Sequence, residues 1–337
     1  MAELRNPGMT SPSPATESPL RITAAPAGEE DRIRPLFREV FKVDISPEMV
    51  GWKYGEGRGR SWGAWDADDE LVVHCGVFYR RALAGGTPRR ITQLGDLMAS
   101  PHKPGGLTRG QSPFARLIRQ LLAELPDASN PDALAFGFPS ERAMRLGERL
   151  GVFAQIDQVH TLSFKPLPGA WNADRVEPLP SLSTQSAHLL DQLWSAMAAD
   201  LQDGLVGVRD AAYLQWRYFE HPIHRYTCLL VRSPWLRRPI GALVVRGDSA
   251  ERELMDVIAP LAHFPRLIQA ARRWLAQTGG DTLHLWLAST YAQRFAPLAQ
   301  SCQPQEFRIM ANPLGPAWVL EKFHHRWWLT SGDTDYR

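Results

Sequence analysis

Apolar and polar residues alternate along this chain with two different periods, and this pattern predicts an α/β protein. From Glu29 to Phe41 the apolar residues lie on one face of a helix and the charged residues on the other. Between 61 and 99 they follow the two-residue period of strands. Ser112 and Ser140 each precede a helical pattern, where serine is a favoured N-cap. In the first half we predict strand 21–25, helix 29–41, strands 61–66, 71–80 and 89–99, helix 113–125, strand 133–138, helix 140–150 and strand 152–164.

A second series of elements follows a proline-rich segment. Pro166 to Pro180 contains four prolines and little periodic pattern, which is typical of a linker. Residues 1–20 are rich in Pro, Ser and Thr, which predicts disorder. We therefore divide the chain into a disordered segment 1–20, a unit 21–165, a linker 166–185 and a second unit 186–337. The second unit is predicted to contain helices 186–199 and 209–219, strands 226–232, 238–246 and 251–258, helix 264–277, strand 282–287, helix 290–299 and a final strand pair within 318–330.

Two short sequences occur once in each unit. Trp52-Lys53-Tyr54 recurs as Trp216-Arg217-Tyr218, and the run from Asp96 to Pro101 recurs from Asp256 to Pro260. An apolar helical pattern and a short apolar strand follow each Asp run. A repeat of this length predicts a duplicated domain, because solenoid repeats are far shorter. We expect Trp52 and Trp216, at matching positions, to pack the core of their own unit.

Composition and charge limit the kinds of partner and cofactor that the chain is expected to bind. The 337 residues carry a formal charge of +2, which requires neither a nucleic acid nor an anionic membrane as partner. No run approaches the roughly 18 apolar residues of a membrane span. Cys75, Cys228 and Cys302 are far apart and lack metal-ligand spacing, and the histidines do not complete a metal set, so no metal is expected. Such cysteine usage favours a reduced, cytoplasmic location.

The order of elements resembles that of the GNAT acyltransferase superfamily. The run from Asp96 to Pro101 matches the strand that in this family supplies backbone groups to acyl-coenzyme A, and 140–153 matches its later helix. The resemblance covers 21–165 well and 186–337 more loosely. It implies an α/β (α+β) tandem protein with two GNAT-like lobes, each a mixed, mostly antiparallel sheet flanked by helices.

The resemblance also implies a binding site for acetyl-CoA, the expected co-substrate. Unsatisfied N–H groups at a helix N-terminus favour an anion, so the glycine-rich basic loop before residue 113 suits the pyrophosphate. A basic surface loop is the alternative. The equivalent run 260–265 has no Gly and no Arg, which favours a structural or substrate-binding second lobe. The expected coenzyme-binding residues are Met98, Ala99, Ser100, Lys103, Gly106, Thr108, Arg109 and Gly110.

Three residues are candidates for the chemistry. Asp96, near the middle of the coenzyme-binding strand, is a candidate base or a structural anchor. His74 lies within a strand, and Tyr79 lies near the end of that strand, where a substrate could enter. Many family members use a Tyr on the later helix as acid, but the matching positions here are Gly147 and Ala296.

The sequence-based prediction is transfer of an acetyl or similar acyl group from acyl-CoA to a primary amine. The acceptor is a small molecule or a peptide, and neither its identity nor the oligomeric state follows from the sequence. Two alternatives remain open. One is a catalytically inactive GNAT-like binding protein, and the other is a Fem-like aminoacyltransferase, whose tRNA donor fits poorly with the near-neutral charge.

Overall fold

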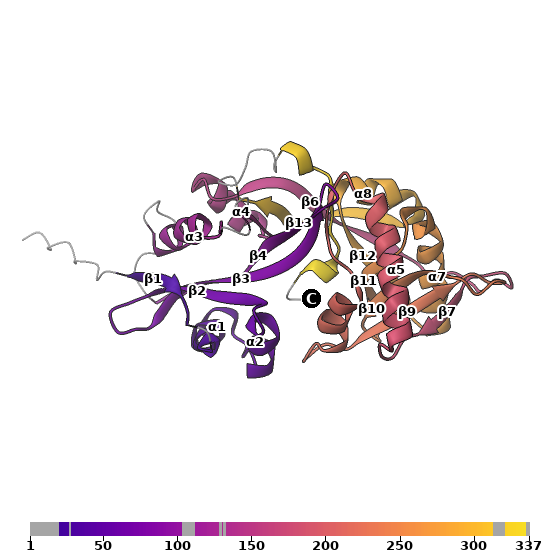
Figure 1. The fold of residues 1–337 in the computed structure, drawn as a ribbon, viewed down its shortest axis with the longest axis horizontal. Helices are drawn as coiled ribbons and strands as arrows, with labels where there is room; N and C mark the ends of the chain where they lie inside the picture. Colours follow the sequence, from indigo (N-terminus) through magenta and orange to yellow (C-terminus); the bar gives the residue numbers. More distant parts are fainter. Residues whose placement is uncertain are drawn as a thin grey trace, which may run out of the picture.

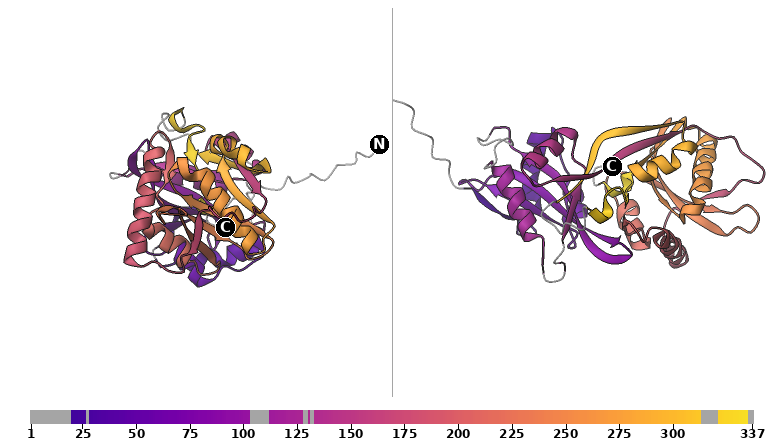
Figure 2. Two further views of the ribbon diagram at one scale, coloured as in Figure 1. Left: turned by 90° about the vertical axis from the view of Figure 1, so that its right-hand side faces the viewer. Right: turned by 90° about the horizontal axis from the view of Figure 1, so that it is seen from above.

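The computed structural model describes residues 20–26, 28–102, 112–127, 130, 133–312 and 321–334. Within these residues, fourteen strands form one mixed, mostly antiparallel sheet that runs through both halves of the molecule (Figure 1). Helices pack on both faces of the sheet (Figures 1 and 2). The predicted fold class is therefore confirmed.

The first half contains the elements that surround the site. Its helices cover two separate apolar clusters, one beneath α3 and one beneath α1 and α2. Ser46, Ser112 and Ser140 cap α2, α3 and α4, so the two N-caps expected from the sequence are confirmed. The elements are β1 (Arg21–Ala24), η1 (Glu30–Ile33), α1 (Arg34–Phe41), α2 (Pro47–Tyr54), β2 (Gly59–Trp65), β3 (Leu71–Ala84), β4 (Thr87–Ala99), α3 (Pro113–Glu124), β5 (Leu134–Gly137), α4 (Glu141–Arg149) and β6 (Ala154–Phe164).

The second half packs around one large apolar core. The segment 166–185, predicted as a linker, contains strand β7, which pairs with β9. The elements are β7 (Arg175–Pro178), α5 (Thr184–Asp200), β8 (Leu205–Gly207), α6 (Ala211–Leu214), η2 (Gln215–Phe219, a π-helix), β9 (Tyr226–Arg232), β10 (Pro239–Arg246), β11 (Glu251–Ile258), η3 (Leu261–His263), α7 (Phe264–Gln277), β12 (Thr282–Ala288), α8 (Ser289–Phe295), η4 (Ala296–Leu298), β13 (Ser301–Ala311), β14 (Trp327–Trp328) and η5 (Ser331–Asp333).

The two halves exchange their last long strands. Strand β6 of the first half pairs with β12 and β13 of the second, and β13 pairs with β5 of the first half. The local order β5-β13-β6-β12 therefore joins both halves into one sheet, and Figure 1 shows β6 and β13 at the junction. Because each half completes its sheet with a strand of the other, we expect neither half to fold well alone.

The tryptophans of the repeated motif also lie at the junction. The rings of Trp52 and Trp216 stack with centroids 4.8 Å apart. Each indole N–H donates to the other residue's carbonyl oxygen, at 2.9 Å from Trp52 and 3.3 Å from Trp216. The expectation that each packs its own unit's core is confirmed for Trp52, which is buried in the cluster beneath α1 and α2. It is wrong for Trp216, which packs against that same first-half cluster. The reciprocal pair therefore forms a contact between the halves.

The C-terminal region differs from its prediction. Strand β13 was not predicted, and the strand pair expected within 318–330 is wrong for the residues described there. Residues 321–323 are helical, and only Trp327 and Trp328 form a short strand, β14, which pairs with β8. Residues 330–334, after β14, pack into the second half beside Asp256.

Candidate functional site

A cavity of about 670 Å³ opens in the first half where β4 and β5 separate. The two strands pair in parallel only from Ile91 to Gln93 of β4, so their later residues diverge. The cavity is largely apolar, and α1, the loop after it and the start of α4 close its sides. Its lining includes Phe37, Phe41, Ile45, Met49, Lys53, Leu94, Gly95, Asp96, Leu97, Phe138, Ser140, Ala143, Met310 and His224.

A β-bulge places Asp96 at this cavity. Between the pairs His74–Met98 and Gly76–Gly95, β4 has two residues where β3 has one. Asp96 has a φ of 45°, in the left-handed region that few residues other than glycine adopt. A bulge bends its strand and redirects a side chain, and bulges are frequent beside active sites. The carboxylate thus projects from the sheet into the space between α2 and β4.

Lys53 and Tyr54 hold the Asp96 carboxylate. Lys53 Nζ lies 2.6 Å from Oδ1, and the Tyr54 hydroxyl donates to Oδ2 at 2.8 Å. The Lys53 side chain is only 4% exposed and that of Asp96 8%. A buried ion pair of this kind makes removal of one partner costly, because the other charge is left unpaired.

His74, on the neighbouring strand β3, contacts the backbone of the bulge. Its Nδ1 donates to the Asp96 carbonyl oxygen at 2.7 Å, which leaves Nε2 to accept from the Ser61 hydroxyl at 2.9 Å. Burial lowers the pKa of His74 to about 4, so the ring is neutral at pH 7. Both ring nitrogens are engaged within the sheet, and His74 does not line the cavity. The contacts of His74 therefore fix the backbone of Asp96.

Other predicted residues lie around the site rather than in it. Tyr79 packs against the cluster under α3 and lines a second, smaller cavity at the junction. Met98 is buried beneath α1 and α2, Ala99 pairs with Val73, and the Ser100 hydroxyl donates to Glu39 at 2.7 Å. The cavity is lined instead by the preceding residues, 93–97. The remaining predicted coenzyme-binding residues, Lys103, Gly106, Thr108, Arg109 and Gly110, lie outside the described residues.

The second half contributes a histidine to the same cavity. His224 follows η2 and lines the cavity together with Ile223. Its backbone N–H donates to His221 Nδ1 at 3.0 Å, and the His221 ring packs on Trp52 at 4.5 Å. Burial, with smaller effects of Arg246 and Arg217, lowers the pKa of His224 below its ordinary 6.5. A neutral imidazole therefore faces the cavity at pH 7.

Lys53 and His224 were not among the candidates selected from the sequence. A signal for Lys53 existed, because it is the middle residue of the repeated Trp-Lys-Tyr motif, and the repeated Asp is its partner in space. His224 had no comparable signal. It reaches the cavity only because the halves pack together, and local sequence does not encode that contact.

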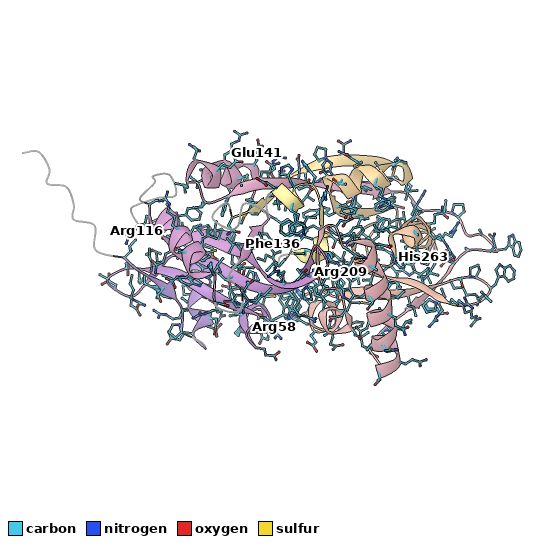
Figure 3. The ribbon with its side chains drawn as sticks, turned by 45° about the horizontal axis from the view of Figure 1, so that its top comes forward. Arg58, Arg116, Phe136, Glu141, Arg209 and His263 are labelled. Carbon is cyan, nitrogen blue, oxygen red and sulfur yellow. The ribbon has the colours of Figure 1, made fainter. Side chains whose placement is uncertain are left out.

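The matching position in the second half is filled by the chain itself. Tyr218 donates to Asp256 Oδ2 at 2.7 Å, as Tyr54 does to Asp96. Asp256 pairs with the fully buried Arg209, as Asp96 pairs with Lys53. Arg209 Nε lies 2.8 Å from Asp256 Oδ1. Arg209 also donates to Asp333 in η5. Figure 3 places Arg209 near the middle of the molecule, where the two halves meet.

Residues 330–334 occupy the space beside Asp256. The Thr330 hydroxyl donates to Asp256 Oδ1 at 3.1 Å, and Arg217 donates to the carbonyl oxygens of Gly332 and Thr334, each at 3.0 Å. A Cβ added at Gly332 would lie 2.6 Å from Asp256 Oδ2, so the segment is in close contact. Asp256 lines neither the cavity beside Asp96 nor the three smaller cavities, although Gly332 and Asp333 line one of these.

Packing leaves no room for a tyrosine at position 147 of α4. Gly147 is buried, and a Cβ added there would overlap the Phe153 ring. Gly147→Tyr is therefore expected to lower the free energy of unfolding by about 1–3 kcal/mol through overpacking. Urea unfolding of this variant beside Arg145→Tyr, at an exposed position of the same helix, measures the effect. Equal stability of the two variants would contradict this explanation.

The described residues contain no group of three or more His, Cys, Asp or Glu side chains suited to a metal ion. Among the helices in this part of the chain, none is both long and apolar enough to span a membrane.

Similar folds occur among acyltransferases. A protein of unknown function from Enterococcus faecalis V583, described as a probable N-acyltransferase, matches with a TM-score of 0.66 and 12% identity, over 87% of this chain and 72% of that one. A GCN5-related N-acetyltransferase from Kribbella flavida gives 0.63 and 15%, over 89% and 72%. Saccharomyces cerevisiae N-myristoyltransferase, solved with myristoyl-CoA and inhibitors, gives 0.56 and 9%, over 90% and 82%.

No protein-family model and no curated protein matches the chain. At these low identities the structural matches establish the fold. The order of strands and helices, the separated β4 and β5 and the structural matches agree with one another. The chain has the GNAT fold.

Proposed function

We propose that this protein is an acyl-CoA-dependent N-acyltransferase whose first half binds the acyl donor. The observation that carries the proposal is the contrast between the halves. The first half opens a cavity at the bulge of β4, whereas the C-terminal segment fills the matching space in the second half. On this view 21–165 is the acyl-CoA-binding lobe and 186–337 a duplicated lobe that supports it.

The residues around the cavity suit acyl-coenzyme A. Strand β4 offers backbone groups at 93–97 where it diverges from β5, and apolar side chains from α1 and from Phe138, directly after β5, can cover a pantetheine arm and an acyl group. Helix α3 begins at Pro113, directly after the segment assigned from the sequence to the pyrophosphate, and we propose that its N-terminus binds that group. Bound there, acyl-CoA supplies the thioester carbonyl that an amine attacks.

His224 is our candidate for the proton acceptor. An attacking amine must lose a proton, and a neutral imidazole at the cavity can accept it. Partial burial and the positive charges of Arg246 and Arg217 lower the pKa of His224, which favours the neutral ring. Asp96, the base candidate from the sequence, has both carboxylate oxygens engaged, so we assign it the role of holding Lys53.

Lys53 is our candidate for charge stabilisation. Its ammonium group lines the cavity and is held in place by Asp96. A fixed cation in a site that excludes water stabilises developing negative charge more than it would in bulk solvent. We therefore assign Lys53 to the charge that builds on the reacting thioester, a role that does not need a tyrosine at position 147.

A catalytically inactive binding protein is the second candidate, and the glycine at 147 is the observation that favours it. Such a protein would bind acyl-CoA without transferring the acyl group to any amine. Aminoacyl transfer from tRNA is less well supported, because an apolar cavity of this kind offers few groups for a nucleic acid.

Filling the cavity tests the proposal. Ala143 lines the cavity at the start of α4, so Ala143→Trp is expected to abolish acyl transfer, whereas Ala123→Trp on the exposed face of α3 keeps it. Both variants are assayed by mass spectrometry with acetyl-, octanoyl- and myristoyl-CoA against a panel of amines and peptides with free N-termini. Equal activity of the two variants, or turnover of no donor by the unmodified protein, would overturn the proposal.

A further inference from the structure

Large apolar side chains at the end of the second half are mostly exposed to solvent. Trp171 is 85% exposed, and Trp235 and Leu236 are each 70% exposed. Exposed apolar residues are ordinary when scattered, but grouped ones mark an interaction surface. We name these three residues the tryptophan tip.

The tryptophan tip is formed by two loops that are distant in sequence. Trp171 lies in a turn before β7, and Trp235 and Leu236 lie in the loop between β9 and β10. The two indole rings meet edge to face with centroids 5.4 Å apart. Figures 1 and 2 show the loops beside β7 and β9 projecting from the end of the molecule opposite β1. The tip therefore projects from the molecule and lies apart from the cavity beside Asp96.

Basic residues surround the tryptophan tip. Of the nearby carboxylates, Asp174 pairs with Arg266 and Glu177 pairs with Arg232. The exposed residues Arg175, Arg237 and Arg238 form no ion pair with an acidic side chain in the part of the chain that the structure describes. The formal charge of +2 for the whole chain conceals this local excess of positive charge.

The loop between β9 and β10 is held in a defined shape. Ser233 N–H donates to the Arg238 carbonyl oxygen at 2.9 Å, and Arg232 donates to the Arg237 carbonyl oxygen at 3.1 Å. Arg237 has a φ of 50°, in the left-handed region. These contacts keep Trp235 and Leu236 at the apex, so their exposure does not arise from an unstructured loop.

We propose that the tryptophan tip docks on an anionic lipid surface. Indole rings favour the boundary between headgroups and acyl chains, where their apolar body and polar N–H are both accommodated. Arginines beside such rings are attracted to anionic headgroups. A projecting tip can insert into a bilayer surface, whereas a protein partner would have to supply a matching recess. This attachment is peripheral and is independent of the proposed acyl transfer.

Vesicle co-sedimentation of the full chain tests the proposal. Unmodified protein is expected to sediment with vesicles of phosphatidylcholine and phosphatidylglycerol, and to be released as NaCl rises from about 50 mM to about 500 mM. The Trp171→Ser/Trp235→Ser/Leu236→Ser variant is expected to bind at least about tenfold more weakly. Because all three side chains are exposed, this variant should keep the native circular dichroism spectrum and melting temperature.

A charge-matched pair separates the role of the arginines from a general effect of charge. Arg237→Glu/Arg238→Glu is expected to weaken binding to the anionic vesicles. The control Arg116→Glu/Arg142→Glu makes the same change in charge at exposed residues of the first half and is expected to leave vesicle binding unchanged. Figure 3 labels Arg116 at the opposite end of the molecule.

Three results would overturn the proposal. The unmodified protein could fail to sediment with anionic vesicles, or the serine variant could sediment as strongly as the unmodified protein. The third is that the unmodified protein self-associates with rising concentration but does not bind vesicles, and that the serine variant no longer self-associates. The tip would then be an interface between copies of this chain.

Discussion

His224→Gln is expected to lower kcat/KM for acyl transfer by about a hundredfold to ten-thousandfold, the range that a positioned general base contributes. Glutamine keeps a polar side chain of similar length but does not accept a proton near pH 7. The first half would still bind acyl-CoA, because the bulge of β4 and the start of α3 are unchanged. The loss should therefore appear in kcat rather than in donor affinity. Steady-state kinetics at saturating acyl-CoA measures it.

The dependence of the rate on pH gives His224 a distinct signature. The neutral imidazole is the active form, so activity falls as pH drops through the pKa of His224. Burial sets that pKa below 6.5, so the unmodified protein should show this acidic limb only below about pH 6.5. The limb should be absent in His224→Gln. His188→Gln on the exposed face of α5 serves as control. Retention of the limb in His224→Gln would assign the base to another residue.

Arg209→Met is expected to lower the free energy of unfolding by about 3–5 kcal/mol, the largest effect on stability that we predict. Arg209 is fully buried and pairs with both Asp256 and Asp333. Its removal leaves two buried carboxylates without their cation and frees the segment that fills the second half. The comparison is Arg232→Met, whose pair with Glu177 is partly exposed and should contribute less than about 1 kcal/mol.

A compensating variant separates the loss of charge pairing from the loss of packing. Adding Asp256→Asn and Asp333→Asn to Arg209→Met removes the unpaired charges, so part of the lost stability should return. Urea unfolding of all four proteins provides the comparison. If Arg209→Met were as stable as Arg232→Met, the buried network would not be what holds the C-terminal segment in place.

Local features of the sequence predicted much of the fold. The helical pattern from Glu29 to Phe41 and the alternating runs through 99 correspond to η1, α1 and strands β2 to β4. The serines before α3 and α4 are N-caps as expected. These features depend on neighbouring residues alone, which is why they can be read from sequence.

Features that depend on distant contacts were missed. Strand β13 has polar residues and Pro304 in its middle, where its register with β6 shifts, so its pattern was obscured. It is a strand because β5 and β6 flank it. The stacking of Trp52 on Trp216 requires the two halves to meet, although the repeat marked both residues.

In the candidate site, too, local sequence pointed to some residues and missed those that depend on distant contacts. Asp96 was selected because it lies near the middle of the strand expected to bind the coenzyme, and it does line the cavity. Its partner Lys53 is distant in sequence, and its left-handed backbone arises from a bulge that strand periodicity does not reveal. His224 reaches the cavity only through packing of the halves. The segment that closes the second half likewise has no local sequence signal for that position.

The central claim is that the acyl donor binds in the cavity beside Asp96 and not at the matching position beside Asp256, and calorimetric titration with acetyl-CoA tests it most directly. The account predicts one site per chain in the unmodified protein, loss of binding in Ala143→Trp and unchanged binding in Ala123→Trp. Two sites per chain, or one site that survives Ala143→Trp, would place the donor elsewhere and contradict the account.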